Sequence, residues 1–257
     1  MTTVVIGSPA GDVTVTVDPS LGGRITSFVV RGTETTCGPA TGTDTFGFGI
    51  YPMVPFAGRV RDAVVSHDGT TARLRAEAGP HALHGTVHSC EWHVDERTPT
   101  YVTMSTDLTA PWPWRGSVSH TISVTERCVR MELTLEARDS QPAMLGWHPW
   151  FARPATLDLP FAVMLERGDD HLPTGRRTEP RTHGIDDCFV EPMGDPAVTV
   201  GGTRLVLRSD CTHWVAFDGA AHGVCVEPQS GAPNAVNDEP EVIPAGGSMR
   251  RWFEIHW

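Results

Sequence analysis

Residues 128–137 read C-V-R-M-E-L-T-L-E-A, and their pattern is the clearest indication of the fold class. Apolar and polar residues alternate almost without a break, which is the period of a β-strand with one buried face. A helix would need apolar residues at positions i, i+3 and i+4, and this segment lacks them. We therefore predict a half-buried strand over residues 128–137.

The same alternation recurs along the chain, for instance as V-T-V-T-V at residues 13–17. Helical patterns are nearly absent, and the 26 glycines and 21 prolines are spread between the apolar runs. Many strands with turns about every 8–12 residues predict an all-β sandwich or barrel. Further strands are expected at residues 24–30, 101–108, 117–124, 155–165, 197–200, 204–209, 213–217, 223–227 and 249–255.

The chain of 257 residues is long enough to bury a sizeable core. It contains no charge run, no Ser/Gly-rich linker and no repeat of fixed period. We predict a single domain over residues 1–257.

Composition excludes several classes of function. The formal net charge is −11, which repels phosphate backbones and anionic membrane faces, so we expect neither nucleic acid nor a membrane as partner. The chain has no lysine, which excludes a Schiff-base lysine and a P-loop lysine. No G-x-G-x-x-G opens a helix and no G-x-S-x-G occurs, so no nucleotide cofactor is expected.

Cysteine usage and the N-terminus indicate a compartment. The six cysteines include no C-x-x-C pair, and the first residues lack a basic region followed by a long apolar run. No stretch approaches the ~20 apolar residues that a membrane helix needs. We expect a cytoplasmic protein with reduced thiols.

Polar and aromatic clusters interrupt the alternation, and these are the candidate functional segments. They are Tyr51–Asp62 (Y-P-M-V-P-F-A-G-R-V-R-D), His81–Gly85 (H-A-L-H-G), Gly146–Phe151 (G-W-H-P-W-F), Val224–Ala235 (V-C-V-E-P-Q-S-G-A-P-N-A) and, more weakly, Gly184–Phe189 (G-I-D-D-C-F).

Glu227 and His148 are the candidate acid–base groups. Glu227 ends a buried-type strand, where a carboxylate needs a partner or a function, although a solvated strand-end glutamate is the alternative. His148 lies between Trp147 and Trp150; histidine is the usual acid–base group near neutral pH, and tryptophan offers a stacking face to a sugar ring. A core histidine in an aromatic cluster is the alternative there.

Arg59 and Asp186 are candidate binding residues. Arg59 lies in a Pro-rich, irregular segment, as a surface arginine or as a donor to sugar hydroxyls. Asp186 and Asp187 are adjacent, so in an extended segment only one faces a given pocket.

The histidines around His84 also permit a metal site. Four histidines and one cysteine fall within residues 81–93, but Gly85, Thr86 and Val87 oppose a helix, and an extended chain spaces the ligands too widely. We predict no metal.

Taken in this order, P-F-A-G-R, L-H-G, W-H-P-W-F, I-D-D-C-F and V-C-V-E-P-Q-S-G-A-P-N-A resemble the motifs of the aldose 1-epimerase (galactose mutarotase) family, from about residue 10 to the C-terminus. The resemblance implies a large antiparallel β-sandwich of the galactose mutarotase-like supersandwich type. It also implies a sugar substrate, no metal and no organic cofactor.

The resemblance assigns a role to each candidate. Glu227 would be the base that takes the proton of the anomeric hydroxyl, and a protonated His148 would donate to the ring oxygen, favoured by the negative field of the chain. The open-chain sugar would rotate about C1–C2 and reclose as the other anomer. The substrate-binding residues would be Arg59, His84, Asp186 and Trp147.

This sequence departs from the family pattern at two positions and leaves two rivals open. Gly58 and Trp147 stand where the family usually has asparagine, which affects substrate recognition more than the acid–base pair. One rival is a hexose-6-phosphate 1-epimerase, which would need arginines around the phosphate. The other is a non-catalytic carbohydrate-binding module. The arginines available for a phosphate are Arg24, Arg61, Arg73, Arg176 and Arg177.

Overall fold

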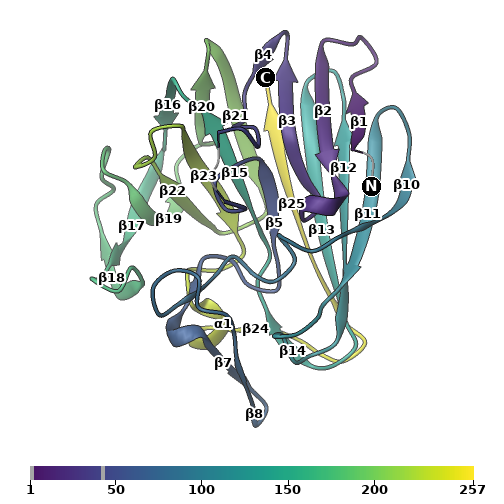
Figure 1. Ribbon diagram of the computed structural model, residues 1–257. Coiled ribbons are helices and arrows are strands. Elements are labelled where there is room, and N and C mark those ends of the chain that lie inside the picture. Colours follow the sequence, from purple (N-terminus) through teal and green to yellow (C-terminus); the bar gives the residue numbers. More distant parts are fainter. Residues whose placement is uncertain (1–2, 42–43) are drawn as a thin grey trace.

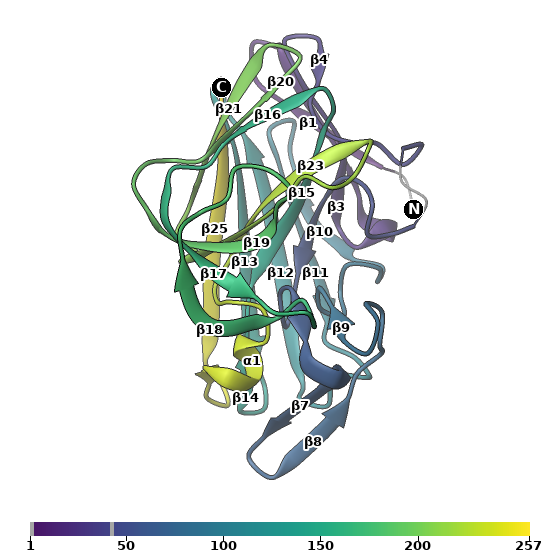
Figure 2. The same cartoon turned by 90° about the vertical axis from the view of Figure 1, so that its left-hand side faces the viewer.

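Two large antiparallel sheets make up most of the molecule in the computed structural model, which describes residues 3–41 and 44–257. The larger sheet has 11 strands and the smaller has eight. Figures 1 and 2 show both sheets from two directions. The all-β prediction is confirmed, and of the two architectures that the strand pattern left open, the structure has the sandwich.

The 11-stranded sheet contains, in spatial order, β1 (Val4–Gly7), β2 (Val13–Asp18), β3 (Arg24–Val30), β5 (Ile50–Met53), β15 (Gly146–Ala152), β23 (Gly223–Gln229), β22 (His213–Phe217), β19 (Asp186–Pro192), β17 (Phe161–Arg167) and β18 (Pro173–Thr178), with β4 (Thr33–Glu34) paired to β3. The eight-stranded sheet contains β10 (His93–Arg97), β11 (Tyr101–Asp107), β12 (Gly116–Val124), β13 (Cys128–Ala137), β25 (Ser248–His256), β21 (Thr203–Ser209), β20 (Ala197–Val200) and β16 (Ala155–Asp158).

Alternation in β13 builds the core as its sequence predicts. Val129, Met131, Leu133 and Leu135 are completely buried, while the residues between them are partly exposed on the outer face. Burying such apolar side chains contributes roughly 1.5–3 kcal/mol each. The inward faces of both sheets therefore form one continuous apolar core.

Smaller elements gather at one end of the sandwich, at the bottom of Figures 1 and 2. Among them, β7–β8 projects as a hairpin, and α1 is a single turn. These elements are β6 (Arg59–Val60) paired to β9 (Ala82–Leu83), β7 (Val64–His67) paired to β8 (Thr70–Arg73), β14 (Gln141–Ala143) paired to β24 (Glu241–Ile243), and α1 (Ala235–Asp238). A 3-10 turn at Arg61–Ala63 follows β6, and another at Pro19–Leu21 connects β2 to β3.

The predicted strand over residues 155–165 is wrong as a single element. The chain forms β16 in the eight-stranded sheet, breaks at Leu159 and Pro160, and continues as β17 in the other sheet. Pro160 has no amide hydrogen for a ladder bond, so it suits the point where the chain crosses between sheets.

Four of the five candidate functional segments contain strands of the larger sheet, whereas His81–Gly85 contains β9 of a separate two-stranded sheet. In β5, β15 and β23 nearly every residue is buried. A strand covered on both faces shows no alternation, which is why these segments looked like interruptions. Within the described ranges, the structure has no helix with the length and apolar character needed to cross a membrane.

Candidate active site

His148 and Glu227 meet on neighbouring strands. β15 and β23 are antiparallel, with Gly146 opposite Gln229 and Trp150 opposite Cys225, so His148 and Glu227 lie midway between these pairs. Nε2 of His148 is 3.2 Å from Oε1 of Glu227, and both side chains are buried. Two residues that are 79 positions apart in sequence, counted from their numbers, thus form one close contact.

The pair borders a cavity of about 190 Å³. This is smaller than the ~300–1,000 Å³ of pockets for drug-sized ligands, which indicates a ligand of about one sugar ring. Both polar and aromatic side chains line it, as a polyhydroxylated ring requires. The lining residues are Phe46, Gly58, Arg59, Leu83, His84, His148, Trp150, Asp186, Val215, Phe217, Glu227, Gln229 and Pro233.

Arg59 and His84 reach this cavity through the short β6–β9 pairing, so Arg59 lies in a strand rather than in an irregular segment. The amide of His84 donates to the carbonyl of Gly58 at 3.0 Å, and His84 has a left-handed φ of 56°. This conformation turns the His84 ring edge-on to His148, with centroids 4.7 Å apart. Arg59 and His84 therefore join the acid–base pair as the sequence predicts.

Asp186 and Asp187 separate as expected. Asp186 lines the cavity. Its carboxylate forms an ion pair with Arg167 at 3.3 Å and lies 3.5 Å from Nδ1 of His171. Asp187 is buried, and its two oxygens lie 3.4 Å from Arg167 and 3.1 Å from Arg181. Asp187 therefore anchors arginines, and Asp186 is the carboxylate available to a ligand.

Trp147 does not reach the cavity. Successive residues of a strand point to opposite faces, so Trp147 points into the core when His148 points to the cavity. Trp147 is completely buried, donates from its indole to Nε2 of His120 at 3.2 Å and packs on Phe253. Trp150 lines the cavity instead and stacks on His148. The spacing of two residues from His148 could have identified Trp150.

Gln229 is a site residue that the sequence analysis did not single out. Its amide nitrogen donates to Oε2 of Glu227 at 3.1 Å, two residues along the same strand. Its own Oε1 is buried without a hydrogen-bond partner, as is Nδ1 of His84 and of His148. Unpaired buried polar atoms are rare in folded proteins, so three around one cavity indicate groups that are available to bind a ligand.

Burial sets the charge state of the pair. Desolvation is the largest cause lowering the pKa of His148 to about 3, with a further contribution from the Arg24 cation. Desolvation, and then the nearby Asp186 carboxylate, hold the pKa of Glu227 well above its usual range. Burial therefore opposes the expected cationic form of His148 and favours the neutral forms of both groups, because desolvation is the largest influence on each.

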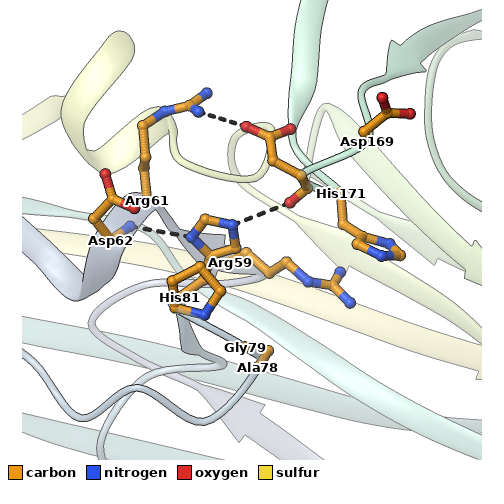
Figure 3. Close-up of a pocket in the computed structure, with 10 residues that line it drawn as sticks. Arg59, Arg61, Asp62, Ala78, Gly79, His81, Asp169 and His171 are labelled. Carbon is orange, nitrogen blue, oxygen red and sulfur yellow. Dashed lines mark hydrogen bonds and ion pairs between the residues drawn. The ribbon is translucent and has the colours of Figure 1, made fainter.

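A second, larger cavity of about 510 Å³ adjoins the first across Arg59. In Figure 3, the side chain of Arg59 extends toward His171. Arg61 pairs with Asp170 at 2.5 Å, and the ring of His81 accepts from the amide of Asp62 at 3.0 Å. These polar groups are mostly used by one another, so the smaller cavity is the better candidate for chemistry.

His84, His148 and Glu227 also present ligand-type atoms within 4.8 Å of one another. Two imidazoles and a carboxylate are a donor set that metals accept. Nε2 of His148 and Oε1 of Glu227 lie 3.2 Å apart, a separation that also suits direct proton transfer between them.

Comparison with known proteins identifies the family and the fold. The profile of the aldose 1-epimerase family matches residues 4–248. No curated protein matches by sequence. The fold is that of a galactose mutarotase-like protein from Clostridium acetobutylicum (14% identity, 96% of this chain and 92% of the other covered, TM-score 0.84) and of an aldose epimerase homologue from C. elegans (15%, 99% and 98%, 0.84).

A further structure with this fold is galactose 1-epimerase from Lactobacillus acidophilus NCFM, with 12% identity, coverage of 99% of this chain and 93% of the other, and a TM-score of 0.82. At such identities the structures establish the fold alone, whereas the profile spans nearly the whole chain. This chain belongs to the aldose 1-epimerase family.

Proposed function

We propose that this protein is a mutarotase that interconverts the α and β anomers of a free aldose. The observation that carries the proposal is the buried His148–Glu227 contact of 3.2 Å beside a cavity of about 190 Å³. In a cyclic sugar, the hydroxyl oxygen and the ring oxygen are both bonded to C1. An acid and a base that act on these two oxygens must therefore lie close together, as these side chains do.

The catalytic steps balance with one proton held by the pair. Glu227, as carboxylate, takes the proton of the C1 hydroxyl while imidazolium His148 gives its proton to the ring oxygen. The C1–O5 bond breaks and leaves an open-chain aldehyde, with Glu227 protonated and His148 neutral. Rotation about C1–C2 presents the other carbonyl face, and reversal of both transfers closes the ring as the other anomer.

The neutral forms that burial favours are those of the open-chain stage of this cycle. A proton moving from Glu227 to His148 across their 3.2 Å contact prepares the pair for ring opening. General acid–base assistance of this kind contributes about 10²–10⁴-fold in rate. Arg59, His84 and Asp186 would bind ring hydroxyls, and Trp150 would replace Trp147 as the stacking face.

A phosphorylated substrate has less support. The arginines that the sequence offers for a phosphate do not gather at the pair: Arg24 is buried against backbone carbonyls, and Arg61 borders the adjoining cavity paired to Asp170. Arg176 and Arg177 pair with Glu166 and Glu191 on the outer hairpin. Comparing glucose 6-phosphate with glucose as substrate separates the two readings.

Polarimetry of freshly dissolved α-D-glucose and α-D-galactose, with and without protein, tests the proposal. We expect faster approach to the equilibrium rotation, lost in His148→Ala and reduced more than ten-fold in Glu227→Gln. His93→Gln, at an exposed position, is the control and should keep full activity. Retention of over a tenth of the activity by Glu227→Gln would refute the assigned base. Sugar binding without acceleration would instead support a non-catalytic module.

A further inference from the structure

Arg24 is a buried cation that the proposed reaction does not use. Only 1% of its surface is exposed, and its guanidinium donates to four backbone carbonyls. Across residues 3–41 and 44–257, no carboxylate oxygen lies within 4.0 Å of it. The acceptors are the carbonyls of Leu21 at 2.7 Å, Thr45 at 2.7 Å, Phe48 at 3.0 Å and His88 at 2.8 Å.

Such a cation is costly to bury without an opposite charge. Burial lowers the pKa of Arg24 to about 10, which still leaves the guanidinium cationic at neutral pH. Carbonyl dipoles satisfy its donors but do not cancel its charge. Asp18 and Asp44 favour the charge of Arg24 without forming an ion pair with it, so part of its positive field reaches the surrounding core.

The ring of Tyr51 links Arg24 to His148. The Cζ atom of Arg24 is 4.7 Å from the centroid of the Tyr51 ring, and Tyr51 stacks on His148 with centroids 4.8 Å apart. Arg24 also donates to the carbonyl of His88 in the segment that carries His84. Arg24 thus contacts Tyr51, which stacks on His148, and the segment that carries His84.

The backbone is shaped to close around this guanidinium. Gly49 has a φ of +76°, and a Cβ atom there would lie 2.5 Å from the carbonyl of Ile25 and 3.3 Å from Cδ of Arg24. At Gly22, a Cβ atom would lie 1.9 Å from the carbonyl oxygen of His88. Side chains at these two positions are therefore incompatible with the present enclosure of Arg24.

We propose that Arg24 is a positioning residue whose fixed positive charge acts together with burial to keep His148 and Glu227 from settling as a permanent buried ion pair. The inference rests on the proposed function. The attraction between two groups 3.2 Å apart favours an ion pair that would oppose proton transfer to a sugar, and the charge of Arg24 adds to burial against that pair.

The charged groups around His148 have opposite effects on its protonation. The carboxylate of Glu227 favours the imidazolium form, whereas Arg24 and any charge on His84 or His88 oppose it. Asp186 and Arg59 act mainly on Glu227, in opposite senses. The titratable neighbours from each packed element are Glu227 of β23, Tyr51 of β5, Arg24 of β3, and His84 and His88 of the segment after β9.

The test compares Arg24→Gln, which removes the charge but keeps an amide to donate to the carbonyls, with Arg24→Lys, which keeps the charge. The readouts are the acidic limb of the pH profile of kcat/KM and the His148 titration followed by NMR of labelled histidine. In Arg24→Gln we expect the His148 pKa and the limb to rise by about 1–2 pH units. Arg24→Lys should stay near the wild-type values even though it loses carbonyl contacts.

Arg130→Gln is the matched control, since Arg130 also lies over an aromatic ring, that of Trp252 at 4.8 Å, but on the eight-stranded sheet. Its His148 titration should equal that of the wild type. An unchanged His148 titration in folded Arg24→Gln would overturn the proposal and leave Arg24 a structural role only.

A second measurement needs no variant. The proposal requires His148 to be neutral in the wild-type protein at pH 7, and an imidazolium signal there would refute it even if Arg24→Gln fails to fold. Neither NMR titration depends on turnover. Absence of mutarotase activity would therefore contradict the proposed function while leaving the effect of Arg24 on His148 measurable.

Discussion

Gln229 donates a hydrogen bond to Glu227 from a position two residues further along the same strand, at 3.1 Å between Nε2 and Oε2. Both side chains are buried, so water cannot replace the bond. A hydrogen bond to a carboxylate favours its charged form, and this one opposes the desolvation that raises the pKa of Glu227. Glu227, the proposed base, thus has a hydrogen-bond donor that favours its ionised form.

Replacing Gln229 by leucine should raise the pKa of Glu227 further and slow the reaction. Hydrogen bonds to charged groups contribute about 1.5–3 kcal/mol, so we expect kcat/KM to fall roughly 10–100-fold at pH 7. Mutarotation rates across pH would check this, with recovery toward higher pH. Gln141→Leu is the control: Gln141 is also buried but bonds to Trp112, so stability should drop and activity should not.

Trp147 and Trp150 should separate stability from binding. Trp147→Phe loses the indole bond to His120 and leaves a gap in the core, so we expect destabilisation by about 1–3 kcal/mol with KM unchanged. Trp150→Ala should raise KM several-fold because a cavity wall is lost. Thermal unfolding and steady-state kinetics on both variants provide the check. A raised KM in a stably folded Trp147→Phe would contradict the placement of Trp147 outside the substrate site.

His120 should make stability depend on pH. It is completely buried, it accepts from Trp147 through Nε2, and desolvation lowers its pKa to about 4. The unfolded chain protonates this histidine near pH 6.5 and the folded protein near pH 4, so stability is lost as pH falls through this range. One such group contributes roughly 3 kcal/mol across the window.

The slope of unfolding free energy against pH between 6.5 and 4 measures this contribution. His120→Gln should have a shallower slope than the wild type, and His93→Gln, at an exposed position, should keep the wild-type slope. Equal slopes for all three proteins would show that protonation of His120 is not linked to unfolding.

Gly58→Asn tests the departure from the family motif. Gly58 has a φ of +67°, which asparagine tolerates better than alanine, and an added Cβ would lie 3.3 Å from the unpaired Oε1 of Gln229. We expect Gly58→Asn to change KM more than kcat, because it adds a donor at the cavity wall. Gly58→Ala should only destabilise, by about 1 kcal/mol or more. A large fall in kcat with Asn would instead implicate the position in the chemical step.

The sequence alone was sufficient for the strands that have one buried face. The alternation in β13 and β12 predicted their bounds within one residue, because each pattern reflects a single apolar face. It could not predict that β16 and β17 lie in different sheets, since sheet membership depends on long-range pairing and not on local pattern.

The candidate site was likewise partly predictable. His148, Glu227, Arg59, His84 and Asp186 surround one cavity, and ordered motifs were enough to select them. Trp147 was mistaken because the pattern did not reveal which strand face points to the cavity. The lowered pKa of His148 could not be predicted from net charge, because burial, its largest cause, is a property of the folded protein.

The proposed acid–base pair and two of the proposed sugar-binding residues lie on different elements of the fold, and this affects which substitutions can change substrate specificity. The acid–base pair is carried by β15 and β23, which are held on both sides by neighbouring strands, whereas Arg59 and His84 come from the small β6–β9 ladder outside the large sheets. Substitutions in the β6–β9 ladder can therefore change which sugar is bound without displacing the proposed acid–base pair. Laboratory evolution of this chain should accumulate specificity mutations around residues 58–63 and 78–85 and leave both central strands intact.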